Sequence, residues 1–182
     1  AIGLFSLGGH GGTVTGDNNL AIGYGNLAYL SSGSNNNALG HYVSYNTTTG
    51  SGNTGVGNRV LYENVTGNFN TAVGANAMDN GTNGNNNSAF GTSALMAAGS
   101  ATFGDNNSAF GYQSLFNGAT GNGNTAFGYR AGAYNVSGND NVFLGKEAGY
   151  NENYSDVSNK LVIANSNTTT PLIAGDFEAA TL

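Results

Sequence analysis

The sequence predicts an all-β protein, a β-solenoid (β-roll) of about eight 17-residue coils. Three observations lead to this fold. A tripeptide of a small residue, an apolar residue and glycine returns at a nearly constant interval, a second glycine precedes each return by seven residues, and an asparagine precedes it by four. Such internal repeats indicate stacked units, each of which is too small to bury a core alone.

The tripeptides set the length of one coil. Their closing glycines, here called anchor glycines, are 17 residues apart in six intervals and 20 residues apart in two. They are Gly3, Gly23, Gly40, Gly57, Gly74, Gly91, Gly111, Gly128 and Gly145. The second glycines are Gly16, Gly33, Gly50, Gly67, Gly84, Gly104, Gly121 and Gly138. Because the seven-residue interval never varies, we expect the three extra residues of each long repeat to precede the second glycine.

The asparagine four residues before each anchor is present in all eight repeats. The residues are Asn19, Asn36, Asn53, Asn70, Asn87, Asn107, Asn124 and Asn141. Stacked asparagines can hydrogen-bond side chain to side chain and to the turn backbone, so we expect a structural ladder. Disorder does not produce a column in constant phase, and we therefore exclude it.

Each repeat contains two short segments of strand character separated by glycine turns. The first holds the apolar pair after an anchor, such as Val60-Leu61, and the second is the Asn-Thr-Ala-apolar segment before the next anchor. Strand side chains alternate between faces. We expect the apolar residue before each anchor to face inward and the alanine before it to face outward with the asparagine. The expected inward set is Ile22, Leu39, Val56, Val73, Phe90, Phe110, Phe127 and Leu144. On this basis Phe110→Asp should be severely destabilising.

Composition excludes several classes of protein. Glycine and asparagine each number 31 of 182 residues, charged residues are 8%, and cysteine is absent. Glycine and asparagine are poor helix formers, and a chain without cysteine has neither a disulfide nor a thiolate metal site. Four basic residues against ten acidic ones argue against nucleic acid as a partner. No apolar run approaches the ~18 residues of a membrane helix, so we expect no membrane insertion.

The repeat divides the chain into two parts. We expect the solenoid to span residues 1–150 and residues 151–182 to form a capping or connecting segment that leads to a missing downstream domain. The sequence begins at Ala1 without methionine or a signal-peptide pattern, so we expect a piece of a longer chain.

Particular segments of the repeat resemble known fibres. Residues 19–23 (Asn-Leu-Ala-Ile-Gly) and 141–145 (Asn-Val-Phe-Leu-Gly) resemble the Asn-Ser-Val-Ala-Ile-Gly repeats of trimeric autotransporter adhesin heads. Residues 107–115 and 124–132 and the closing segments 159–166 and 170–177 are similar to those of phage-type tail fibres and bacterial surface fibre adhesins. The resemblance implies a trimeric β-roll that mediates attachment, outside the cell, on a virion or phage-like tail fibre or on a bacterial surface.

A homotrimer is also expected from the shape of the coil. One narrow solenoid buries little surface for its length. Small alanines on the expected outer face of the strand would allow neighbouring chains to approach closely, in a parallel homotrimer. These alanines are Ala21, Ala38, Ala72, Ala89, Ala109 and Ala126. A monomer whose alanines face water is the alternative.

Nothing in the sequence indicates an enzyme, a cofactor or a metal site. Metal centres usually gather three or four ligands, and the only histidines are His10 and His41. Glycan hydrolysis needs a pair of carboxylates. Glu147, Glu152 and Asp156 could cluster where the rod ends, but a solvated end face is the simpler interpretation. We expect no catalytic residue.

The expected function is attachment by a non-enzymatic fibre segment. The candidate binding residues follow anchor glycines and are Tyr24, His41, Tyr112, Tyr129 and Arg130. Tyrosine and arginine often supply contact energy at binding surfaces, and aromatic faces and asparagine amides suit glycans on a cell-surface receptor. Two alternatives stay open: a pure rigid spacer with recognition elsewhere in the parent chain, and an ice-binding solenoid. The hydroxyl column for ice would be Thr15, Ser32, Thr49, Thr66, Thr120 and Ser137.

Overall fold

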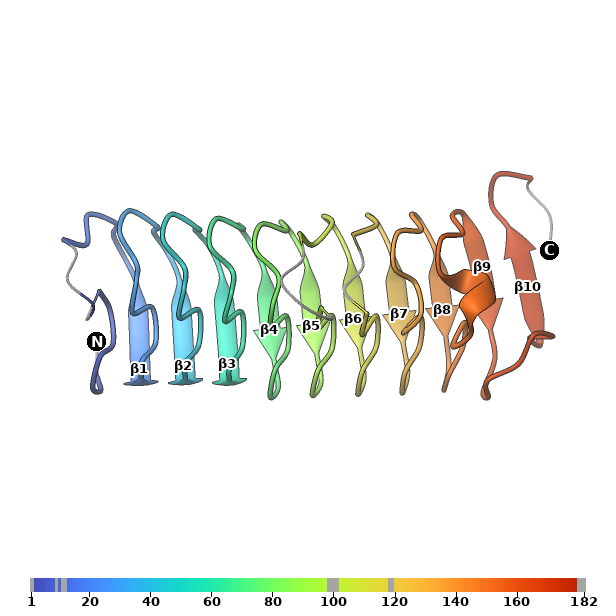
Figure 1. Cartoon of the computed structure of the whole chain (residues 1–182), viewed down its shortest axis with the longest axis horizontal. Helices are drawn as coiled ribbons and strands as arrows, with labels where there is room; N and C mark the ends of the chain where they lie inside the picture. Colours follow the sequence, from blue (N-terminus) through green and yellow to red (C-terminus); the bar gives the residue numbers. More distant parts are fainter. Residues whose placement is uncertain (1, 9, 11–12, 98–101, 118–119, 180–182) are drawn as a thin grey trace.

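The computed structural model is a straight rod built from one continuous β-sheet, with the two termini at opposite ends (Figure 1). It describes residues 2–8, 10, 13–97, 102–117 and 120–179. The strands are β1 (Leu20–Tyr24), β2 (Asn37–His41), β3 (Thr54–Asn58), β4 (Thr71–Val73), β5 (Ser88–Phe90), β6 (Ser108–Phe110), β7 (Thr125–Phe127), β8 (Val142–Leu144), β9 (Lys160–Ile163) and β10 (Ile173–Asp176). The predicted β-solenoid of about eight turns of ~17 residues is confirmed.

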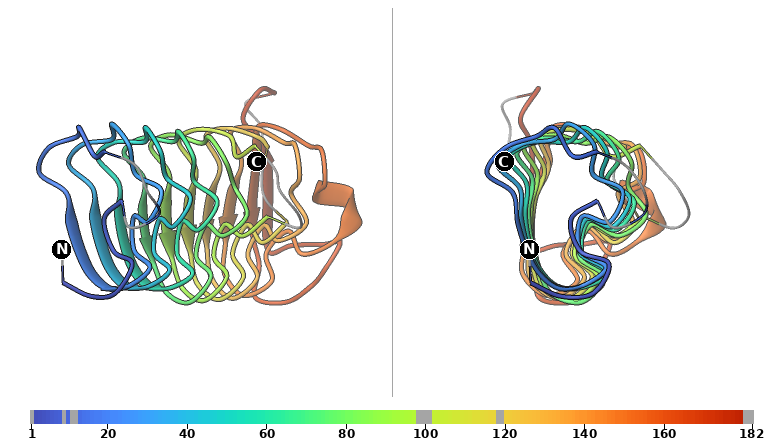
Figure 2. Two further views of the ribbon diagram at one scale, coloured as in Figure 1. Left: turned by 60° about the vertical axis from the view of Figure 1, so that its left-hand side comes forward. Right: turned by 90° about the vertical axis from the view of Figure 1, so that its left-hand side faces the viewer.

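Equivalent residues of successive coils lie in register along the rod. Strands β1 to β9 pair in parallel in chain order, and the column Phe90, Phe110, Phe127 is aligned as expected. Viewed down the rod, the coils superpose, with the strands forming one wall and the turn segments the other (Figure 2). The extra residues expected in the long repeats fall in stretches that include residues 9, 11–12 and 98–101, which lie outside the described residues.

The end of the rod departs from the repeat. A 3₁₀ helix, η1 (Glu152–Tyr154), follows the last regular turn, and β9 then continues the parallel sheet. Strand β10 pairs with β9 in the antiparallel direction. The sheet therefore runs across residue 150, while the backbone between β8 and β9 no longer follows the 17-residue pattern. The described part of the chain contains no helix with the length and hydropathy needed to span a bilayer.

The prediction of which strand residues point into the coil is wrong. The alanines of the strand column are at most 1% exposed and form the core, whereas the apolar residues beside them lie on the outer face. Leu39 is 47% and Phe127 58% exposed. The reason is the width of the coil: a Cβ atom on Gly55, which stands in the alanine column, would come within 2.5 Å of Val43 Cγ1 on the opposite wall. Leucines and valines from that wall fill the interior, so strands β1 to β7 carry only alanine or glycine in this column. In β8 the buried Phe143 takes the same position, opposite Gly132 and Gly149.

The prediction of a strand segment directly after each anchor glycine is also wrong. After each anchor glycine the chain turns, and the residues two and four positions later adopt left-handed conformations with φ between 48° and 57° in every non-glycine case. These residues are Phe5, Leu7, Leu27, Tyr42, Ser44, Arg59, Leu61, Asn76, Met78, Ser93, Leu95, Gln113, Leu115, Arg130 and Glu147. Such conformations cost free energy for non-glycine residues. Backbone hydrogen bonds between coils, such as Leu61 N to Ala77 O at 3.1 Å, hold them in place.

The asparagine ladder lies inside the coil and joins each coil to the next. The Asn36 side chain accepts a hydrogen bond from Asn53 N at 3.0 Å and donates one to Gly50 O at 2.9 Å. The same two bonds recur along the column, with donor–acceptor distances of 2.7–3.1 Å. From Asn36 onward the ladder residues are at most 1% exposed, whereas Asn19 at the first coil is partly exposed. Each asparagine thus satisfies buried backbone groups of the following coil, and the second glycines belong to this network.

Candidate functional site

The predicted binding residues stand where the strands end and the turns begin. Tyr24 and His41 are the last residues of β1 and β2 and pair in register. Their rings stack with centroids 5.1 Å apart. Both rings also contact the ring of Tyr42, in the turn that follows β2.

Tyr24 and His41 belong to a larger cluster, here called the N-terminal aromatic patch. It consists of Phe5, His10, Tyr24, Tyr29, His41, Tyr42, Tyr45 and Tyr62, whose neighbouring ring centroids lie 4.3–6.2 Å apart. Sequence reasoning found only two of the eight residues. Tyrosines five residues after successive anchors, at Tyr45 and Tyr62, were a signal that could have revealed the rest.

Polar and charged side-chain groups of this patch contact one another and its rings. The Tyr45 hydroxyl lies 3.2 Å from His10 Nε2, and the Arg59 guanidinium lies 4.0 Å above the Tyr62 ring. Arg59 also pairs with the buried carboxylate of Asp79 at 3.1 Å. Burial raises the pKa of the Tyr45 hydroxyl, and its neighbour Tyr29 raises it further. The rings of the patch therefore contact mostly each other.

Tyr112, Tyr129 and Arg130 form a second group, separated from the first by the turns after β4 and β5 (residues 74–80 and 91–97), which contain no aromatic residue. The rings of Tyr112 and Tyr129 stack with centroids 5.4 Å apart. Arg130 donates from Nε to Gln113 Oε1 at 2.8 Å and from a terminal nitrogen to the Tyr150 hydroxyl at 3.4 Å. The five predicted residues thus fall into two separate groups.

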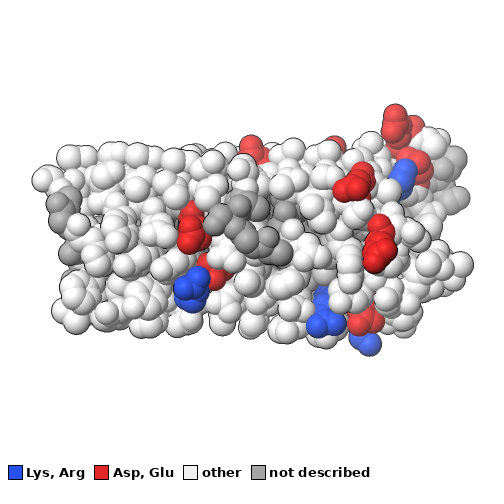
Figure 3. Space-filling model, viewed as in Figure 1, with Lys and Arg blue, Asp and Glu red and all other residues white. Residues whose placement is uncertain are grey.

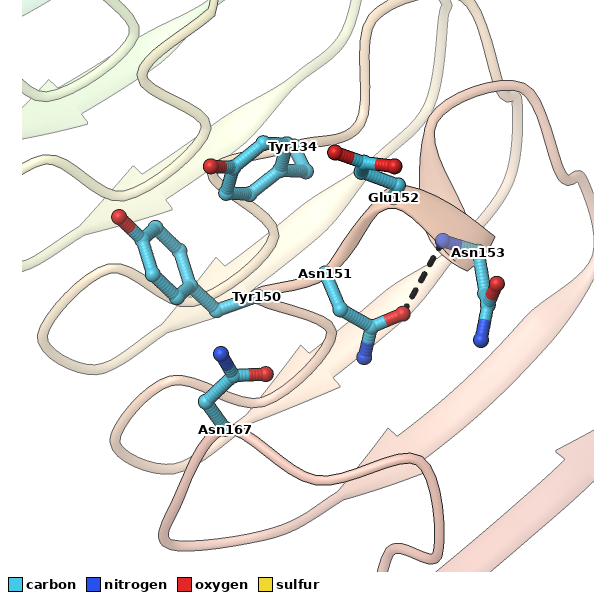
Figure 4. A pocket seen from close by; sticks show the side chains of 6 residues that line it. All are labelled: Tyr134, Tyr150, Asn151, Glu152, Asn153 and Asn167. Atoms are coloured by element: carbon cyan, nitrogen blue, oxygen red, sulfur yellow. Dashed lines mark hydrogen bonds between the residues drawn. The ribbon is translucent and has the colours of Figure 1, made fainter.

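Next to the second group is a hollow of about 350 Å³, here called the terminal pocket. It is lined by Tyr134, Tyr150, Asn151, Glu152, Asn153 and Asn167 (Figure 4). Tyr134 comes from the turn after β7, Tyr150 from the turn after β8, and the next three residues from the start of η1. Asn167 reaches the pocket from the loop after β9. Apart from Glu152, considered as a possible acid, sequence reasoning missed this site, because it forms where the repeat breaks.

A smaller hollow of about 210 Å³ adjoins the terminal pocket and shares two of its residues, Tyr134 and Tyr150. Its other lining residues are Gln113, Phe116, Asn117, Arg130 and Ala133. Arg130 therefore connects the predicted group around Tyr112 and Tyr129 with the terminal pocket.

The acidic residues lie mainly toward the C-terminal end, as the charged side chains on one face of the rod illustrate (Figure 3). The three acids expected near the rod end have different surroundings. Glu147 lies 3.8 Å from the Lys146 ammonium, Asp156 accepts a hydrogen bond from Ser137 at 2.8 Å, and Glu152 lines the terminal pocket. Among the residues that the structure describes, no three His, Asp or Glu side chains gather as a metal site would require.

In comparisons with known proteins, no family model, curated protein or solved structure matches this chain. The resemblance to fibre repeats therefore rests on the repeat motif alone.

Proposed function

We propose that the chain is a non-enzymatic structural segment of a trimeric fibre, either a tail fibre or a surface adhesin, that attaches to a cell surface outside the cell. The observation that carries this proposal is the uninterrupted apolar column on the outer face of the sheet. Solvent-exposed apolar patches that extend over many residues are uncommon on monomers and often mark contacts between chains.

The outer face of the sheet has the form expected of such a contact. The apolar residues before successive anchors lie one above another, and Phe90, Phe110 and Phe127 stack with centroids 5.0 and 5.9 Å apart. Nine parallel strands ~4.8 Å apart make a face about 40 Å long, and short strands make it about 15 Å wide. Its area is roughly 600 Å², which a trimer would divide between two neighbouring chains.

The contact between chains therefore differs from the one expected from the sequence. The alanines that were expected to face neighbouring chains are buried inside the coil, and we propose that the apolar column makes the contact instead. Three copies would turn their sheet faces toward a common axis. The resemblance to fibre repeats supplies the number three.

This arrangement would leave the turn face on the outside of the fibre. The aromatic residues of the turn face would then be available to a receptor, and each would occur three times. Weak single contacts could add up to stable attachment through multivalency. Aromatic rings and asparagine amides suit a glycan receptor.

Sedimentation equilibrium tests the assembly. The wild-type chain should sediment at three times its 18.3 kDa mass. Phe110→Asp would place three charges at the common axis and should yield a folded monomer. Thr92→Asp, which puts the same charge on an exposed turn residue, is the matched control and should remain trimeric. A wild-type monomer at micromolar concentration would overturn the trimer.

Binding of the chain to host cells tests attachment. A folded trimer that binds no cells would leave the rigid spacer as its role. Thermal hysteresis tests the ice-binding alternative. Hydroxyls of the Thr column already bond within the chain, since Thr66 donates to Asn83 at 2.9 Å and Thr120 to Val136 O at 3.0 Å.

A further inference from the structure

We propose that the terminal pocket binds a neutral saccharide of the cell surface. This inference rests on the attachment role proposed above and names the site and the chemical class of the ligand. The pocket volume of about 350 Å³ is at the lower end for small-molecule sites and suits one or two sugar rings.

The polar groups of the pocket are prepared for a ligand. Within the described residues, the side chains of Glu152, Asn153 and Asn167 make no hydrogen bond to the chain, although all three line the hollow. A carboxylate accepts hydrogen bonds from sugar hydroxyls, and an amide can both donate and accept. The three side chains together can thus satisfy several hydroxyls that point in different directions.

Asn151 fixes the shape of the pocket rather than serving the ligand. Its carbonyl oxygen accepts a hydrogen bond from Asn153 N at 3.0 Å and caps η1. Its amide nitrogen donates to Thr168 O at 3.2 Å, in the loop that carries Asn167. One side chain therefore joins the two segments that supply the polar lining, and this preorganisation reduces the entropic cost of binding.

The aromatic side of the pocket can hold the apolar face of a sugar ring. The rings of Tyr134 and Tyr150 meet edge to face with centroids 4.9 Å apart and an interplanar angle of 68°. In Figure 4 the Glu152 carboxylate is turned toward Tyr134, and Asn167 approaches from the opposite side. Arg130 contacts the Tyr150 hydroxyl at 3.4 Å and lies 5.4 Å from the centre of that ring, which restrains its orientation.

The charge of the pocket selects a neutral ligand. Glu152 is the one charged residue among the six that line it. The whole chain carries a formal charge of −6. A sialic acid, uronic acid or phosphorylated sugar would place its negative charge beside this carboxylate, and the repulsion would oppose binding. A single carboxylate also lacks the partner that glycoside hydrolysis requires, so the pocket would bind its sugar without cleaving it.

A glycan array that contains matched neutral and sialylated glycans, followed by calorimetric titration of each neutral hit, tests the proposal. The wild-type chain should bind neutral glycans and reject their sialylated counterparts. Tyr150→Ala should weaken binding at least tenfold, and Glu152→Gln should weaken it severalfold while reducing the discrimination against sialylated glycans. Phe177→Ala and Glu178→Gln are the matched controls, because both residues are exposed on the C-terminal segment and neither lines the pocket; both variants should bind as the wild type does.

The outcomes separate this proposal from the attachment role. Cell binding that persists in Tyr150→Ala, or glycan binding lost in Phe177→Ala, would overturn the pocket and leave attachment intact. A wild-type chain that binds neutral glycans on the array but no cells would support the pocket and overturn attachment. An array without any neutral hit would overturn the pocket. Circular dichroism of every variant establishes that the coil is intact.

Discussion

The two aromatic regions of the turn face differ in one respect that matters for binding. From Tyr24 to Tyr62, the N-terminal aromatic patch follows coils with the 17-residue period, and the rings of Tyr45 and Tyr62 stack with centroids 5.2 Å apart. At the C-terminal end, η1 replaces the regular turn after Tyr150, and the rings line a hollow instead. Strict repetition closes the surface because each side chain covers the next. A binding pocket needs a place where the repeat is interrupted.

The inner and outer faces of the strand carry different kinds of residue. The inner face carries alanine and asparagine, and the outer face carries the larger apolar residues. The inner residues form the core of the coil, and in the proposed trimer the outer ones would make the contact between chains. Substitutions on the two faces should therefore damage different properties.

The largest effect is expected from a charge on the inner face. Ala109→Asp would bury an unpaired carboxylate in a fully buried position, at a cost of roughly 3–5 kcal/mol, which is a large part of the stability of a small domain. Urea denaturation followed by circular dichroism measures the loss. Phe110→Asp, one residue away on the outer face, is the matched control. It should change the sedimenting mass while leaving the secondary structure in place.

If both variants unfold equally, the division between the two faces is wrong. The expectation from sequence that Phe110→Asp would unfold the monomer was based on the inverted facing of the strand. With Phe110 on the outer face, the charge meets water in a monomer, so the free energy of unfolding of a monomer should change little.

The next effect concerns the asparagine ladder. Asn36 is buried and its side chain takes part in hydrogen bonds with Asn19, Gly50 and Asn53, whereas the adjacent Asn37 is exposed on the outer face. Asn36→Ala would leave buried backbone groups unsatisfied and should cost about 2–4 kcal/mol, since each such group costs ~1–3 kcal/mol. Asn37→Ala should change the unfolding free energy by less than about 0.5 kcal/mol. Equal losses in the two variants would show that the ladder contributes no more than an exposed asparagine.

The periodic part of the molecule could be predicted from the sequence, because every coil repeats the same residue spacing and the same contacts with its neighbours. The constant spacing of Gly50 and Asn53 from the next anchor gave the coil length and the in-register columns. It could not give the facing, because period-two alternation is the same whichever side is inward. The width of the coil determines which face of the strand is inward, through contacts such as that between Gly55 and Val43. The sequence pattern does not reveal this contact, because the two residues are distant in sequence.

The terminal pocket could not be predicted for a related reason. Tyr134, Tyr150 and Asn167 come from three different coils or loops, and no shared motif joins them. The 3₁₀ turn at Glu152 that places them depends on the Asn151 cap, a local signal too short to stand out in a chain with 31 asparagines.

The smallest effect is expected at the antiparallel end of the sheet, in comparison with the regular coils. Lys160 on β9 pairs with Asp176 on β10 at 2.6 Å, and hydrogen bonding to Lys160 lowers the pKa of the Asp176 carboxyl. A lowered pKa in the folded state stabilises the β9–β10 pair above the ordinary carboxyl pKa near 4. This stabilisation is lost as the pH falls through the lowered value.

Hydrogen exchange of amides 160–163 and 173–176 should therefore become faster below about pH 4, after correction for the intrinsic rate. Amides of β2 and β3, which carry no acidic residue, should change less. Asp176→Asn removes the titrating group and should abolish the pH dependence at the end of the sheet. Unaltered pH dependence in that variant would show that another carboxyl controls the pairing of β10.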